Sequence, residues 1–203
     1  MTTPLGPGLS ARSAPRLKPA VIGVSGNVAS GKTVLSRAIA DTLGWRWGSF
    51  GDEVRRLTRE RGLDADNRLV LREVGQTLVE TAGEGFCRAV LERAGWHLGE
   101  GVVLDGVRHA TIVFIVRRLV EPMPFRLVLV TTPETVREER LAARRAARVS
   151  EPSRADIDYH ATERDVSQTL PSLADVIVDG GVDMAQLVKD VLQRLSRPGT
   201  CSA

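Results

Sequence analysis

Residues 21–33 read VIGVSGNVASGKT, and this stretch decides the fold. Its first part is an apolar run, which predicts a buried strand of a parallel sheet. The second part has the spacing Gly26-x-x-x-x-Gly31-Lys32-Thr33 of a phosphate-binding P-loop, with a helix expected to begin near Lys32. Strand, loop and helix follow in the order that such a loop requires, so we expect it to bind a nucleoside triphosphate.

The residue types of the loop assign a role to each part of it. Gly26 and Gly31 permit backbone conformations and close approaches that a Cβ atom would block. Lys32 is expected to reach the β- and γ-phosphates of ATP, and the Thr33 hydroxyl is expected to join the shell of a Mg²⁺ ion. The residues predicted to bind the nucleotide are Gly26, Asn27, Val28, Ala29, Ser30, Gly31, Lys32 and Thr33.

Length and composition indicate an ordinary globular protein. The chain has 203 residues, enough for one domain with a full core, and 42% of them are apolar. The net charge is only +3, and the arginines are mixed with Glu and Asp, so nothing points to nucleic acid as a partner. Cys87 and Cys201 lack metal-ligand spacing and are expected to be free thiols. With no apolar run of membrane-spanning length and no signal-like start, we expect a cytoplasmic monomer or homodimer without a membrane partner.

Apolar strands alternate with helical segments along the chain. The predicted strands are 19–25, 45–50, 101–105, 125–130 and 174–178, and the predicted helices are 32–43, 53–61, 64–80, 83–94, 110–120, 133–147, 161–170 and 182–195. This alternation predicts an α/β fold of three layers, with a five-stranded parallel sheet between helices on both faces. Residues 1–17 and 197–203 are expected to be flexible tails that flank one domain over 18–196.

Ligands of such sheets gather at the carboxyl ends of the strands. Asp105 stands at one of these ends, after four apolar residues, in the pattern of an acidic Walker B-like residue. Beside the P-loop it would hold Mg²⁺ through water. The alternative is an ordinary aspartate in the turn before Gly106.

Several segments resemble motifs of adenylate kinases. Residues 49–55, SFGDEVR, resemble their S-T-G-D-x-L-R segment, and residues 103–108, VLDGVR, are similar to their L-D-G-F-P-R. Residues 132–145 match the P-x-E…D-R-x-x-x-R-R pattern that opens their lid, and Arg154 and Arg164 loosely match the arginines on its far side. Residues 174–178, ADVIV, are closer to deoxynucleoside monophosphate kinases and adenylate kinase-like proteins. Over residues 19–195 the chain is therefore similar to P-loop nucleoside monophosphate kinases.

This resemblance implies a P-loop kinase fold with an acceptor-binding helical region at about 50–98 and a short lid at about 144–160. It implies that Arg55 and Arg108 grip an acceptor phosphate and that Arg140 lies near the base and phosphates of the donor. Arg144, with Arg154 and Arg164, would neutralise the transferred phosphoryl group. The alternative for Arg140 and Arg144 is a solvated helix face on which they pair with Glu or Asp.

The class of substrate depends on Asp52. A phosphate acceptor needs no general base, whereas a hydroxyl acceptor would need a carboxylate such as Asp52. The structural alternative is that Asp52 caps a helix beginning at Glu53. The leading hypothesis is a kinase that uses Mg²⁺ and ATP to phosphorylate a nucleotide acceptor. The alternatives are a kinase acting on a hydroxyl of a nucleoside or other metabolite, and a regulatory P-loop ATPase.

Overall fold

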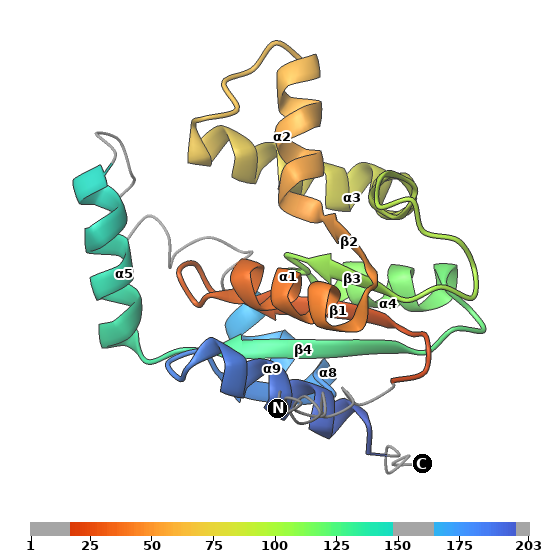
Figure 1. Cartoon of the computed structure of the whole chain (residues 1–203). Coiled ribbons are helices and arrows are strands. Elements are labelled where there is room, and N and C mark those ends of the chain that lie inside the picture. The colour runs from red at the N-terminus through yellow and green to blue at the C-terminus, as the bar shows by residue number, and fades with distance from the viewer. Residues whose placement is uncertain (1–16, 148–164, 198–203) are drawn as a thin grey trace, which may run out of the picture.

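The computed structural model describes residues 17–147 and 165–197, and its centre is a parallel sheet (Figure 1). The strand order is β2-β3-β1-β4-β5. The strands are β1 (Val21–Gly26), β2 (Arg46–Ser49), β3 (Val102–Asp105), β4 (Phe125–Thr131) and β5 (Val176–Asp179). All four pairings are parallel, which confirms the predicted fold class.

Helices cover both faces of the sheet and extend beyond its carboxyl edge. They are α1 (Lys32–Leu43), α2 (Phe50–Glu60), α3 (Arg68–Arg93), α4 (Ala110–Leu119), α5 (Glu134–Ala147), α8 (Leu170–Leu173) and α9 (Met184–Leu195), with a π-helical turn η1 (Asp165–Thr169) before α8. Figure 1 shows α2 and α3 together on one side of the loop that follows β1, and α5 on the other side. None of the described helices is long and apolar enough to cross a membrane.

Strand β1 is the centre of the core because it is buried along its whole length. Successive side chains of a strand point to opposite faces. Val21 accordingly packs in the apolar cluster formed with α3, α4 and α8, and Ile22 packs in the cluster formed with α1 and α9. A Cβ atom at Gly23 would lie 2.7 Å from the Phe125 ring, so glycine at this position lets the Phe125 side chain of β4 pack directly against β1.

Two predicted helices begin elsewhere than expected, and a side-chain cap explains each of these starts. A single helix α3 replaces the two predicted at 64–80 and 83–94, with a kink where Ala82 has non-helical angles. It begins only after Asn67, whose side chain accepts hydrogen bonds from the N–H groups of Leu69 and Val70. Helix α2 begins earlier than predicted, at Phe50, because the Ser49 hydroxyl caps it. The expected tails lie outside the described residues, apart from Leu17 and Arg197.

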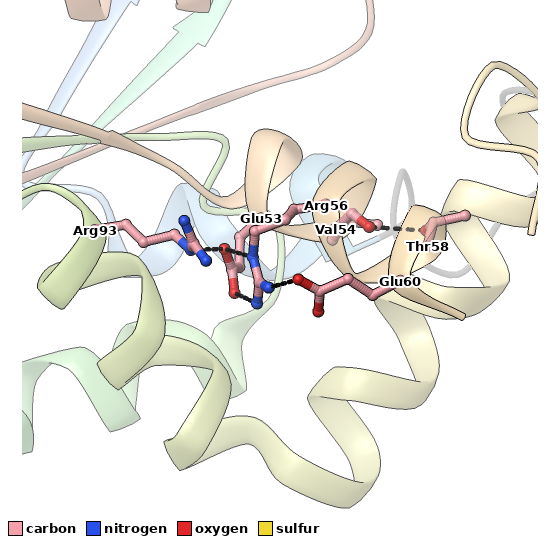
Figure 2. A network of polar contacts seen from close by, with 6 residues as sticks. All are labelled: Glu53, Val54, Arg56, Thr58, Glu60 and Arg93. Carbon is pink, nitrogen blue, oxygen red and sulfur yellow. Dashed lines mark hydrogen bonds and ion pairs between the residues drawn. The ribbon is translucent and has the colours of Figure 1, made fainter. Parts of the chain in front are cut away.

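A buried carboxylate ties α2 to the end of α3 (Figure 2). Glu53 is only 2% exposed, and its two oxygens accept hydrogen bonds from Arg56 at 2.7 and 3.0 Å. The Nε atom of Arg93, in the last turn of α3, lies 2.9 Å from the same carboxylate. Arg56 also pairs with the exposed Glu60. Because a buried charge is costly unless it is paired, these contacts fix where α2 stands.

We expect Glu53→Gln to destabilise the fold more than Glu60→Gln, although both carboxylates bind Arg56. The Glu53 change removes charge-assisted hydrogen bonds from a buried site and should lower the free energy of unfolding by about 1.5–3 kcal/mol. The Glu60 side chain is 56% exposed, and exposed ion pairs contribute little. Urea unfolding of the two variants measures the difference, and equal stabilities would contradict the anchoring role of Glu53.

Cys87 lies on the side of α3 that faces the core, and its side chain is fully buried. Burial raises the pKa of this thiol to about 12, and the nearby Glu84 carboxylate adds to the shift. The reactive thiolate is therefore scarce at neutral pH. In a Cys201→Ser variant, which leaves Cys87 as the one thiol, we expect a disulfide reagent to react only as fast as the chain unfolds. Fast labelling at pH 7 without denaturant would contradict this packing.

Candidate functional site

The loop between β1 and α1 has the backbone geometry of an anion cradle. Gly31, the residue before α1, has a φ angle of 92°, and Gly26 has a φ angle of 151°. A Cβ atom at Gly26 would lie 2.6 Å from the Val130 carbonyl oxygen, so only glycine fits there. The Lys32 ammonium donates a hydrogen bond to the Asn27 carbonyl at 3.1 Å, which places its charge inside the curve of the loop. This geometry suits a polyphosphate at the start of a helix.

Thr33 and Asp105 meet beside the loop. The Thr33 hydroxyl donates a hydrogen bond of 2.8 Å to Oδ2 of Asp105, and pairing of β1 with β3 brings the two residues together. Asp105 is 5% exposed, and its Oδ1 has no hydrogen-bond partner among the described residues. Burial raises the pKa of Asp105, while Lys32 and the Thr33 hydrogen bond act in the opposite direction. A buried carboxylate oxygen with spare capacity next to a hydroxyl fits a hard cation such as Mg²⁺.

A cavity of about 390 Å³ opens next to this pair. Its walls come from the P-loop, α1, the start of α2, α3 and the turn between β3 and α4. Of the described residues that line it, two are acidic, Asp52 and Asp105, and six are basic: Lys32, Arg37, Arg55, Arg68, Arg72 and Arg108. The excess of positive charge favours an anionic ligand.

Asp52 lies in the first turn of α2 rather than at its cap. The cap is Ser49, whose hydroxyl accepts a hydrogen bond of 3.2 Å from the Asp52 N–H, so the predicted capping role of Asp52 is wrong. Its carboxylate is exposed and pairs with Nη1 of Arg55 at 3.0 Å. Both residues line the cavity, and Arg108 enters it from the β3–α4 turn. The fold thus brings Asp52, which was predicted to contact the substrate, together with the two arginines that the resemblance assigns to the acceptor.

Among the arginines predicted for the lid, the structure describes the side chain of Arg140 alone. The Arg140 guanidinium donates to the carbonyl oxygens of Ala29 and Ser30, both at 3.3 Å, and to that of Gly180 at 2.9 Å. It is half-buried against the outside of the P-loop, so the alternative of a solvated helix face is wrong for this residue. Arg144 lies on α5, but its side chain is outside the described part of the chain, as are Arg154, Arg164 and the predicted lid after residue 147.

Sequence reasoning missed three cavity arginines and the setting of one tryptophan. Arg68 and Arg72 lie one turn apart on α3, and both line the cavity. They were missed because the helix was predicted to begin at residue 64, before its true start at Arg68. On the other side, the guanidinium carbon of Arg37 lies 3.6 Å from the centre of the Trp47 ring. The indole N–H of Trp47 donates to Ser36 at 3.0 Å. Arg37 could have been found from the sequence, because Thr33 and Arg37 are four residues apart and therefore lie on the same face of the helix.

The sheet order, the P-loop, the Thr33–Asp105 pair and the arginine-lined cavity together have the form of a P-loop nucleotide-binding protein. Residues 22–160 match the family described as "AAA domain", which covers more than half of the chain, and the chain belongs to that family. A cytidylate kinase of Methanothrix thermoacetophila is 26% identical over 161 residues, which are 79% of this chain and 88% of that protein. This match confirms the resemblance to nucleoside monophosphate kinases.

Solved structures share the fold at lower identity. A gluconokinase from Sinorhizobium meliloti 1021 is 21% identical with a TM-score of 0.54, over 90% of this chain and 94% of that one. An APS kinase from Mycobacterium tuberculosis, solved with AMPPNP and APS, is 15% identical with a TM-score of 0.57, over 89% and 99% of the two chains. At such identities the likeness shows a common fold and does not select the acceptor.

Proposed function

We propose that this protein is a Mg²⁺- and ATP-dependent kinase that transfers the γ-phosphoryl group to a nucleotide acceptor of the nucleoside monophosphate type. The observation that carries the proposal is the single cavity that joins Lys32 and the Thr33–Asp105 pair to five arginines. Phosphoryl transfer spreads negative charge over the transferred group, and its catalysis is chiefly positioning and electrostatic stabilisation. A cavity with this charge supplies both.

The donor half is the P-loop. Its backbone N–H groups and Lys32 would hold the β- and γ-phosphates of ATP. Thr33 and Asp105 would hold Mg²⁺, which neutralises charge on the phosphate oxygens when it is bound. Lys32 points into the loop from the first residue of α1, so its ammonium is already near the place of the phosphates.

The acceptor half is the wall formed by α2, α3 and the β3–α4 turn. Arg55 and Arg108 would grip the acceptor phosphate, since guanidinium groups bind phosphate oxygens in pairs. Arg68 and Arg72 add two more cations on the same side of the cavity. A nucleotide acceptor is further supported by the similarity of the chain, over most of its length, to a cytidylate kinase.

A second candidate function follows from the exposed Asp52 carboxylate in the same cavity. In a kinase that phosphorylates a hydroxyl, Asp52 would accept the proton of the attacking oxygen. Its pairing with Arg55 favours the first candidate, because a carboxylate held by a guanidinium serves better to orient that arginine than to remove a proton.

Replacement of the P-loop lysine tests the donor half. In a screen of nucleoside monophosphates, nucleosides and other metabolites, we expect at least one nucleoside monophosphate to stimulate ADP formation by the unchanged protein. With that acceptor, Lys32→Ala should lower kcat by about 10²-fold or more, because the variant loses the positive charge that would stabilise the transferred group. Lys189→Ala, on the exposed side of α9, is the matched control and should keep its activity. Slow ATP hydrolysis that no metabolite changes would instead favour a regulatory ATPase.

Asp52→Asn separates the two acceptor classes. The amide keeps the shape of the side chain and can still contact Arg55, but it cannot act as a base. For a phosphate acceptor we expect a rate near that of the unchanged protein at all pH values from 6 to 9. A fall of about 10²–10⁴-fold would instead assign a hydroxyl acceptor.

A further inference from the structure

The outer side of the P-loop is bound by arginines of α5. Arg140 donates to the carbonyls of Ala29 and Ser30, and Nε of Arg137 donates to the carbonyl of Val28 at 3.1 Å. The hydroxyl of Thr132 donates to the Ser30 carbonyl as well, at 3.1 Å. Three consecutive carbonyls of the loop are therefore hydrogen-bonded from outside, two of them by the same guanidinium.

The turn after β5 completes this contact. Arg140 also donates to the Gly180 carbonyl at 2.9 Å, so one side chain joins the P-loop to that turn. A Cβ atom at Gly180 would lie 2.4 Å from the Ser30 carbonyl oxygen and 2.5 Å from the Thr132 hydroxyl. The absence of a side chain at residue 180 is thus a condition for the turn to pack against the loop.

These contacts set the direction of the N–H groups. In a trans peptide unit the C=O and N–H bonds point in opposite directions. The Ser30 carbonyl shares its unit with the Gly31 N–H, and the Val28 carbonyl shares its unit with the Ala29 N–H. Gly31 and Ala29 both line the cavity, whereas Arg137 and Arg140 do not. Cations that hold these carbonyls outside also polarise the peptide units, which strengthens the N–H groups as donors toward an anion.

The backbone of Ala29 needs such support. Its φ angle is 64°, in the left-handed region that a residue with a Cβ atom seldom adopts. A conformation of this kind persists where the surroundings over-determine it. Here the surroundings are the guanidinium on the Ala29 carbonyl and the hydrogen bond of the next N–H, that of Ser30, to the Asn27 carbonyl at 3.2 Å.

We propose that Arg140 is a positioning residue that holds the P-loop in its anion-binding form from the carbonyl side, and that it acts on the polyphosphate of any ligand independently of the base. This inference rests on the proposed function, because it assumes that the loop binds a polyphosphate. It differs from the role implied by the family resemblance, in which Arg140 lies near the base and phosphates of the donor.

The test compares the binding of ATP, ADP and inorganic tripolyphosphate to the unchanged protein and to Arg140→Ala, by calorimetry. We expect the variant to bind all three ligands about ten- to a hundredfold more weakly and by the same factor, since each loses the same preorganised N–H groups. Hydrogen exchange of residues 27–31 should become faster in the variant. Arg194→Ala is the matched control: Arg194 donates to the Ile177 carbonyl at 2.8 Å, far along the chain from the loop, and its loss should leave binding unchanged.

Each other outcome overturns the inference in a recognisable way. Weaker binding of ATP and ADP with unchanged binding of tripolyphosphate would assign Arg140 to the base. Unchanged binding with a lower kcat would assign it to the transferred phosphoryl group, and no change at all would leave it without a role at the site. Should Arg140→Ala not fold, Arg140→Lys carries the same comparison, because a lysine keeps the charge but cannot bind the carbonyls as a fork. If the unchanged protein binds none of the ligands, the proposed function itself fails.

Discussion

The hydrogen bond between Thr33 and Asp105 depends on the whole central sheet and in turn organises the site. It exists because β3 pairs with β1 in a register that sets Val24 opposite Asp105, and because α1 begins one residue before Thr33. A shift of that register by one residue would turn Asp105 to the other face of the sheet. The register is held by apolar side chains buried on both faces of β1 and β3, such as Ile22 and Leu104. The chemistry of the site is therefore fixed by core packing some distance away.

The two halves of the cavity are held in place by different forces. The donor half stands directly on β1 and β3, which are fully buried strands. The acceptor half stands on α2 and α3, which extend beyond the sheet and are joined by the Glu53 carboxylate and its arginines (Figure 2). Asp52 and Arg55 flank Glu53 on α2, so the buried ion pair sets the position of both. An ion pair with a half-buried and an exposed arginine gives way more easily than a close-packed core, which suits a wall that would admit and release the proposed acceptor.

Sequence reasoning succeeded where one physical cause dominates. The strand of residues 21–26 is apolar because it is buried on both faces, and Gly26 of the P-loop stands where a side chain would collide with Val130. Sequence reasoning failed where two causes compete. Asp52 has the residue type of a helix cap, but Ser49 three residues earlier takes that place, and helical periodicity cannot decide between two capping side chains. The cavity face of α3 was missed because Asp64 and Asn67 bind backbone N–H groups and delay the helix.

The chemistry of arginine bears on why this chain has so few lysines. Lysine occurs only at positions 18, 32 and 189, and the remaining basic side chains are arginines. At Lys32 the positive charge is a compact ammonium that lies inside the curve of the loop. At residue 140 the requirement is different, because one side chain must donate to three carbonyls in different directions. Only a fork of several N–H groups on a rigid plane can do this. The same residue type thus serves both sides of the P-loop, with phosphate proposed inside the cavity and peptide carbonyls outside it.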